Sequence, residues 1–431
     1  MNNMSIRILS LLCFVLFSIF VRADNISVVS SRNDSIKENI QNFDPYVATQ
    51  KYLDTLSPEK KAQSDAYFVG GYWLIIWNMV ADIIVAFIFL SFGISKWIKK
   101  IAFKVKYVNL QNLIYVGFFI LLYYILNLPL YVYQDFFREH QYNLSNLTFG
   151  GWFKEELIGL SLAIIMGGPL IMFIYIAIRK VRQNWWIWGS IISFIFMVTG
   201  SLIFPIFISP LFNEYKPLPE GKLKNEILSI ARANGVPATE VYQFDASKQS
   251  PKISAYVAGF GSTTRICLND NLLNKCTTAE IREVMGHETG HYVLNHIYKS
   301  LIFFGLLIFL GFYFVNKAYD VLLKRWGKKW NISDLSDIGG LPLLVLLFAL
   351  LVFLATPISN NITRTMEIEA DYFGINAARE PDASASVAMK LSTYRKINPG
   401  YWEEIIFYDH PSGKTRVLNA MKWKAEHLKI P

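Results

Sequence analysis

The sequence predicts a predominantly α-helical membrane protein with six or seven transmembrane helices and an α+β domain that bears a small β-hairpin or sheet. Of its 431 residues, 53% are hydrophobic and only 17% are charged, whereas a soluble chain carries roughly a quarter charged residues. The apolar residues gather into runs that are long enough to cross a bilayer as helices. A polar stretch at 210–299, with β-forming residues at 240–269, predicts the α+β part.

The chain begins with a short apolar run at 8–21, between Arg7 and Arg22. Because this run is short for a span and ends near a small-residue cleavage pattern, we interpret residues 1–23 as a signal peptide. The alternative is a first transmembrane helix, which would raise the number of spans from six to seven. Residues 24–70 are polar and predict an exposed segment with some helix.

Six later runs predict transmembrane helices, at 72–94, 110–133, 157–178, 185–209, 300–315 and 339–359. They divide the chain into an N-terminal membrane domain at 24–209 and a second domain at 210–425, which contains the spans near 300–320 and 339–360. Asp82 is an ionisable residue inside the first of these spans. We therefore expect its helix to line a polar or solvated space.

Basic residues predict the orientation, and their positions at membrane borders explain the positive charge better than a nucleic-acid partner does, so we expect no such partner. The net charge of +9 arises largely beside the apolar runs, with basic clusters in the loops at 95–109, 179–184 and 324–338. The positive-inside rule places these loops in the cytoplasm. The 210–299 region and the C-terminal tail then face the periplasm or a lumen, across a bacterial inner membrane or an ER-type membrane.

The three cysteines do not indicate a disulfide framework or a metal site. Cys13 lies in the first apolar run, and Cys267 and Cys276 lack metal-ligand spacing. These two thiols could pair or stay free.

Residues 284–296 read VMGHETGHYVLNH, which has the spacing of a zinc-protease helix. Positions i and i+4 of a helix share one face, so His287 and His291 can bind one zinc ion per chain. Glu288 beside them can take a proton from the catalytic water. We expect this helix to run from about Thr278 to 297, with His296 off the ligand face in a structural role. The alternative is an exposed helix with two incidental histidines.

Glu367 is the best candidate for the third protein ligand that a zinc site needs. It is four residues from Asp371 on a predicted helix, whereas Glu369 points elsewhere. The chain crosses the membrane twice between His291 and Glu367, and helical rise places each about 13 Å from its span. The alternative is a charged cap after a transmembrane helix. Such a cap would explain one glutamate but not the i, i+4 spacing of Glu367 and Asp371. Asp371 could orient a ligand histidine or donate a proton to the departing amine.

Two further segments are candidates for contacts with a substrate. Residues 252–270 predict a hairpin around 259–262, whose exposed edge strand could pair with an extended peptide or could be purely structural. The tail at 409–417 contains His410 and Arg416. A histidine with a cationic partner can stabilise a tetrahedral oxyanion.

Together these segments resemble the integral-membrane zinc metalloproteases of the type I CAAX prenyl endopeptidase family. The resemblance spans about residues 40 to 425. Its main motifs are HETGH at 287–291, AYVAGFGSTTRICLNDNLL at 255–273, TRTMEIEAD at 363–371 and HPSGKTR at 410–416.

The resemblance implies a ring of transmembrane helices around a water-filled chamber and cleavage near the C-terminus of a peptide or protein substrate. It implies that the zinc ligands are His287, His291 and Glu367 and that the general base is Glu288. Asp371 would handle a proton, and the oxyanion would lie near His410 and Arg416. The substrate strand would contain Ser254, Ala255 and Tyr256.

This sequence departs from the family pattern at two positions and in its predicted orientation. Ser254 stands where the family usually has asparagine, and Ser412 replaces a proline. The family's catalytic domain faces the cytosol, whereas the loop charges place it on the other side.

The sequence therefore predicts a membrane-embedded zinc metalloendopeptidase whose partners are its substrate and the lipid bilayer. One alternative is a broad-specificity membrane quality-control metalloprotease, which the resemblance through the N-terminal spans disfavours. Another is a non-enzymatic, metal-regulated membrane carrier. An intact Glu288 beside only three ligands disfavours it, because a structural site would fill the fourth position.

Overall fold

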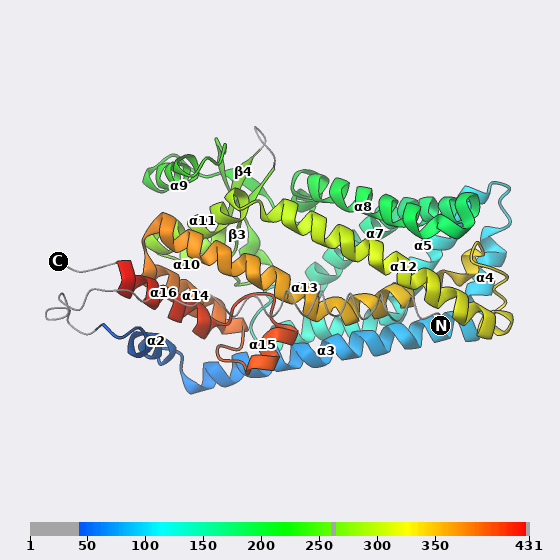
Figure 1. Cartoon of the computed structure of the whole chain (residues 1–431), viewed down its shortest axis with the longest axis horizontal. Helices are drawn as coiled ribbons and strands as arrows, with labels where there is room; N and C mark the ends of the chain where they lie inside the picture. Colours follow the sequence, from blue (N-terminus) through cyan, green and yellow to red (C-terminus); the bar gives the residue numbers. More distant parts are fainter. Residues whose placement is uncertain (1–42, 260–263, 428–431) are drawn as a thin grey trace, which may run out of the picture. The chain divides into compact units, whose positions relative to one another are not determined.

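The computed structural model describes residues 43–259 and 264–427. The predicted signal peptide and the alternative first span therefore lie outside the described residues. From Asp44 onward the chain forms one unit, in which long helices run side by side and a small sheet lies near one end of them (Figure 1).

Each of the six predicted runs lies within or largely within a long helix. These helices are α3 (Pro58–Ser91), α5 (Val108–Tyr131), α7 (Phe149–Val181), α8 (Trp185–Ile203), α12 (His296–Trp330) and α13 (Leu341–Ala378). In the described chain, five helical stretches are long and apolar enough to span a membrane, because α7 and α8 fall within the single stretch Phe149–Leu211. The short turn Arg182–Asn184 separates these two helices. The number of crossings stays a prediction.

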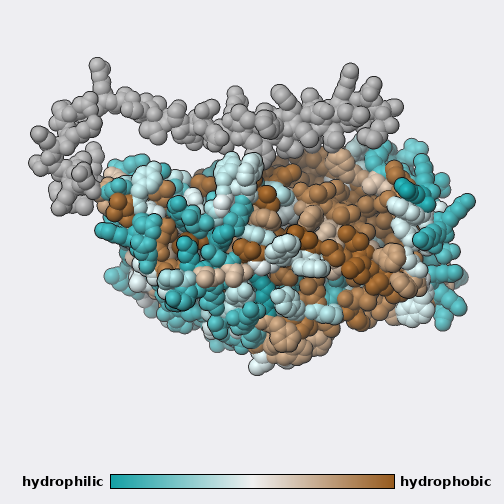
Figure 2. Space-filling model, turned by 90° about the horizontal axis from the view of Figure 1, so that it is seen from below, coloured by the Kyte–Doolittle hydropathy of each residue, from teal (hydrophilic) through white to brown (hydrophobic). Residues whose placement is uncertain are grey.

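The outer surfaces of these helices are apolar. Large side chains such as Trp77, Phe87, Ile302 and Leu354 are more than half exposed. A soluble protein rarely exposes apolar patches of this extent, whereas a lipid bilayer would cover them. Figure 2 shows this surface as a brown region over the membrane helices, with hydrophilic surface on either side of it.

The three basic loops lie together at the end of the helices away from the sheet (Figure 1). The Nζ atom of Lys99, in α4 (Ile94–Ala102), lies 2.7 Å from Oδ1 of Asp337. Arg179 and Arg182 line a cavity of about 910 Å³ with Asp334. Contacts between these loops place their positive charges at one membrane face.

Asp82 has a polar partner among the long helices. Its carboxylate accepts a hydrogen bond from the hydroxyl of Tyr123 in α5 and lines a cavity of about 10 Å³. A cavity of that size holds about one water. Tyr123 therefore gives the carboxylate a polar partner, and the solvated space beside this helix stays a prediction.

The sheet has four strands in the order β1-β2-β4-β3. They are β1 (Tyr215–Pro217), β2 (Val241–Phe244), β3 (Ala255–Ala258) and β4 (Arg265–Asn269). The β3–β4 pair is antiparallel, which confirms the predicted hairpin, although residues 260–263 of its turn lie outside the described chain. The structure leaves both Cys267 and Cys276 as free thiols.

The remaining described helices pack around the sheet and the ends of the long helices. Helix α9 (Lys222–Ala233) precedes β2, and α10 (Asp270–Lys275) follows β4. The others are α2 (Pro45–Leu53), α6 (Arg138–Gln141), α11 (Thr278–Val293), α14 (Pro381–Leu391), α15 (Tyr401–Phe407) and α16 (Gly413–His427).

The histidine helix ends earlier than the sequence predicts. We expected it to continue to 297, but α11 ends at Val293 and α12 begins at His296. Asn295 adopts a left-handed conformation with φ of 59°, which asparagine tolerates better than most residues. This break separates α11 from α12. The distance of about 13 Å between His291 and its span assumed a continuous helix and therefore does not apply. By contrast, α13 runs without a break from the membrane segment to Glu367 and beyond.

Candidate metal centre and active site

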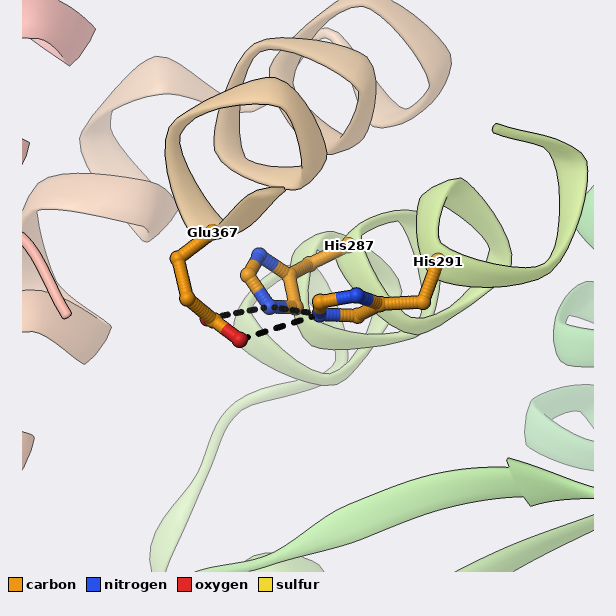
Figure 3. Close-up of side chains that lie close together, drawn as sticks. All are labelled: His287, His291 and Glu367. Atoms are coloured by element: carbon orange, nitrogen blue, oxygen red, sulfur yellow. Dashed lines mark hydrogen bonds and ion pairs between the residues drawn. The ribbon is translucent and has the colours of Figure 1, made fainter. Parts of the chain in front are cut away.

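The three predicted zinc ligands meet at the crossing of α11 and α13. The Nε2 atoms of His287 and His291 lie 3.1 Å apart. Carboxylate oxygens of Glu367 lie 3.3 Å from Nε2 of His287 and 3.4 Å from Nε2 of His291. Figure 3 shows both rings extending from α11 toward the carboxylate on α13. The three residues form a group that could hold a metal ion.

These distances fit zinc. Zinc binds imidazole nitrogen and carboxylate oxygen at about 2.0–2.2 Å in tetrahedral sites, so neighbouring ligand atoms are about 3.3 Å apart. The three measured separations, 3.1, 3.3 and 3.4 Å, have this size. Burial lowers the pKa of His291 to about 4, which keeps that imidazole in the neutral form that binds a metal.

Glycines allow α11 and α13 to cross closely enough to form this group. A Cβ atom at Gly286 would lie 2.9 Å from the carbonyl oxygen of Gly374. A Cβ atom at Gly374 would lie 2.8 Å from the backbone nitrogen of His287. Backbone atoms in a packed helix cannot move aside alone, so any side chain here would push the helices apart. The separation of His287 from Glu367 thus depends on two residues that carry no side chain.

Gly374→Ala is expected to separate the two helices and weaken metal binding. Overpacking of this kind costs about 1–3 kcal/mol in the free energy of unfolding, and thermal unfolding in detergent with zinc analysis by mass spectrometry would measure both effects. Gly117→Ala in α5 is the matched control, because its Cβ would meet no atom within 4 Å. Normal zinc content and stability in Gly374→Ala would contradict the role of this crossing.

Asp371 lies behind His287, one helical turn after Glu367. Its Oδ1 atom is 2.9 Å from Nδ1 of His287, which leaves Nε2 of that ring directed to the metal position. Arg416 donates to the same carboxylate oxygen. This arrangement can hold the ligand histidine in one tautomer. Arg416, which we expected near the oxyanion, has its guanidinium group paired with Asp371.

A second chain of polar groups supports His291 and was missed from the sequence. Nδ1 of His291 lies 2.9 Å from Nδ1 of His296, whose Nε2 lies 3.0 Å from Oε2 of Glu369. Lys299 donates to the same oxygen at 2.7 Å. The break at Asn295 brings the ring of His296 back to His291, where it contacts Nδ1 and not the Nε2 atom that faces Glu367. The available signal in the sequence was Asn295, because asparagine adopts the left-handed backbone conformation more readily than most residues.

His296→Phe is expected to weaken zinc binding about 10–100-fold, as for other residues that orient a metal ligand. Phenylalanine keeps the ring in place but removes the nitrogen that contacts His291. Competition with a zinc chelator would measure the affinity without requiring catalysis. His427→Phe, near the C-terminus, is the control histidine, because it contacts Trp423 and not the metal centre. Unchanged affinity in His296→Phe would contradict the prediction.

Glu288 lies between two cavities beside the metal centre. One has a volume of about 1040 Å³ and is also lined by His291, Tyr292 and Glu367. The other, of about 230 Å³, is lined by His287, Glu367, His410 and Arg416 as well. Burial raises the pKa of Glu288 to about 7, and the nearby Glu367 carboxylate adds to this shift. A carboxylate with a pKa near neutrality suits a general base.

His410 reaches the metal centre from the C-terminal segment. Its Nε2 atom lies 3.4 Å from Oε2 of Glu367, and its Nδ1 atom lies 2.8 Å from Oδ1 of Asp409. Arg364, one turn before Glu367, donates to the carbonyl oxygen of Tyr408 at 2.7 Å. This contact ties the segment to α13 and brings His410 to the metal centre.

The predicted substrate strand is an edge strand next to the metal centre. Tyr256 lies in β3 and Ser254 directly precedes that strand, which pairs on one side with β4. Ser254 and Ala255 line the smaller cavity, whereas Tyr256 lines the larger one. The other edge of β3 has no strand partner in the described chain. The structure thus places all ten predicted site residues around one centre.

Two family models and a curated relative match the chain. Residues 217–424 match Peptidase family M48, and residues 42–214 match a model described as CAAX prenyl protease N-terminal, five membrane helices. A protein of Bacillus subtilis (strain 168), named Uncharacterized metalloprotease YhfN, is 30% identical over 370 residues, which cover 85% of this chain and 87% of the relative. The chain belongs to peptidase family M48.

Other relatives of this M48 chain have more specific names. CAAX prenyl protease 1 of Saccharomyces cerevisiae is 34% identical over 211 residues, which are 48% of this chain and 46% of the relative. The crystal structure of S. mikatae Ste24p matches with a TM-score of 0.72 and 26% identity, covering 88% of this chain and 94% of that one. The chain is therefore a membrane zinc metalloprotease of the Ste24 type. This confirms the predicted family, enzyme class and cofactor, and excludes the non-enzymatic carrier.

Proposed function

We propose that this protease hydrolyses peptide bonds near the C-terminus of peptide or protein substrates, with the residues at the α11–α13 crossing as its catalytic centre. The observation that carries the proposal is a zinc-sized group of ligands beside the free edge of β3. An extended peptide can add to such an edge through backbone hydrogen bonds. Its scissile bond would then lie between the two cavities that Glu288 lines.

The proposed chemistry assigns one task to each residue. Zinc held by His287, His291 and Glu367 would polarise the scissile carbonyl and acidify the attacking water. Glu288 accepts the proton of that water and passes it to the leaving amine. Asp371 keeps Nε2 of His287 directed inward. His410 donates to the oxyanion that forms on the carbonyl oxygen. Arg416 acts through Asp371, with which it pairs.

The test uses the purified protein in detergent and two short peptides that end in Cys-Val-Ile-Ala, one farnesylated on cysteine and one unmodified. Mass spectrometry of the products would locate the cut. Cleavage near the C-terminus of either peptide supports the proposal, and a strong preference for the farnesylated peptide would extend it to the activity named for the yeast relative. Failure to cleave either peptide with zinc bound would contradict it.

We also propose that the metal centre faces away from the cytoplasm, with a membrane domain at 24–209 and a metallopeptidase domain at 210–425. The support is the gathering of the three basic loops at the end away from the sheet. Family resemblance favours the opposite orientation. Reporter enzymes fused within 324–338 and after the C-terminus would decide, and a cytoplasmic C-terminus would overturn the loop-charge orientation.

A further inference from the structure

The two ends of β3 open into different cavities. Residues Tyr256 to Gly259 line the large cavity, whose described lining contains no lysine or arginine and includes Phe204, Phe212 and Phe304. Ser254 and Ala255 line the smaller cavity instead. Both cavities are lined by Glu288 and Glu367, so the metal centre lies between them. A peptide along β3 would therefore meet a lining without lysine or arginine on one side of the scissile bond, and a lining that includes Arg395 and Arg416 on the other.

A third cavity continues from the smaller one. It has a volume of about 370 Å³ and shares Ile253 and Tyr394 with the smaller cavity. Four lysines and no carboxylate line its described surface. We call these residues the lysine pocket: Lys60, Lys252, Lys275 and Lys390. Arg395 adds a further positive charge where the smaller cavity passes beside Tyr394.

The partners of these lysines leave donors for a ligand. Lys252 pairs with Glu139 at 3.0 Å and Lys390 with Glu280 at 2.7 Å, but neither glutamate lines the pocket. Each ammonium group has three donors. Lys60 is exposed and pairs with no carboxylate among the described residues. Positive charge therefore exceeds negative charge on the surface that faces the pocket.

We propose that the lysine pocket binds the free C-terminal carboxylate of the substrate, an inference that rests on the proposed peptidase function. The charge of the pocket then sets the direction of the peptide, because its negative terminus lies at the Ser254 end of β3. The peptide runs antiparallel to β3, and its N-terminal part enters the large cavity. A carboxylate that accepts hydrogen bonds from lysine makes the strong, charge-assisted kind of contact.

The spacing also predicts where the cut falls. Ala255 lines the smaller cavity together with His287 and Glu367, whereas the lysine pocket begins at Ile253 and reaches Pro251. At about 3.3 Å per residue in an extended strand, the carboxylate would lie about two to four residues beyond the scissile bond. The favoured substrate is thus a chain end, and not an internal segment of a longer chain.

The test compares three forms of whichever Cys-Val-Ile-Ala peptide is cleaved: the free acid, the C-terminal amide, and the acid extended by several glycines. Loss of one charge-assisted contact corresponds to about tenfold or more. We expect kcat/KM to fall by that factor in the amide and in the extended peptide, mainly through a higher KM. Binding of the same peptides to Glu288→Gln would measure the effect without turnover.

Lys60→Gln, alone and with Lys252→Gln, is expected to lower the acid-to-amide ratio of kcat/KM toward one. Lys61→Gln is the matched control, because this neighbouring exposed lysine does not line the pocket, and the wild-type ratio should persist. If the wild type cleaved and bound the acid and the amide equally, the carboxylate site would be overturned, but the proposed peptidase function would stand. If neither form is cleaved, the proposed function fails and the inference with it.

Discussion

Glu288→Gln is expected to abolish peptide cleavage and to leave zinc bound. The amide has nearly the same size as the carboxylate but cannot accept a proton from water. General base catalysis contributes about 10²–10⁴-fold, so kcat is expected to fall by about that factor. Glu288 lines both cavities beside the metal group but is not one of its three members. Product analysis by chromatography and zinc analysis by mass spectrometry would measure the two properties separately.

Glu240→Gln provides the control for a change of charge in the same part of the chain. Glu240 is about half exposed and pairs with Lys224, away from the metal centre, so its replacement should preserve both kcat and zinc. If Glu288→Gln kept its turnover within a few fold of the wild type, another group would have to accept the proton.

Glu367→Gln is expected to remove zinc from the purified protein. The substitution replaces a charged ligand oxygen with a neutral amide between two imidazoles that lie 3.3 and 3.4 Å away. Residues that only orient a ligand contribute about 10–100-fold to metal affinity, so loss of a ligand should exceed about 100-fold. Zinc content after dialysis against a weak chelator would measure this, and peptide cleavage should disappear with the metal.

Glu369→Gln is the matched comparison, two residues further along α13. The carboxylate of Glu369 contacts His296 and Lys299 and not the metal position. The zinc affinity of Glu369→Gln should therefore fall by only about tenfold. Stoichiometric zinc in dialysed Glu367→Gln would show that this glutamate is not the third ligand.

Local patterns in the sequence determined the elements and most of the metal centre. Apolar runs predict helices because a bilayer requires about 20 apolar residues in a row, and the six runs lie in the long helices. The i, i+4 spacing of His287 and His291 predicts a shared face because the helix repeats every 3.6 residues. Glu367 follows from the same period and from the two crossings that the sequence predicts between the two segments.

Tertiary structure alone decided how these elements meet. The left-handed conformation of Asn295 ended α11 and brought His296 to His291, which a continuous helical period could not predict. The close crossing depends on Gly286 and Gly374, far apart in the sequence. Likewise, Lys60 and Lys390 line one cavity although some three hundred residues separate them. Helical periodicity is a property of neighbouring residues, whereas these contacts arise only when distant segments pack against one another.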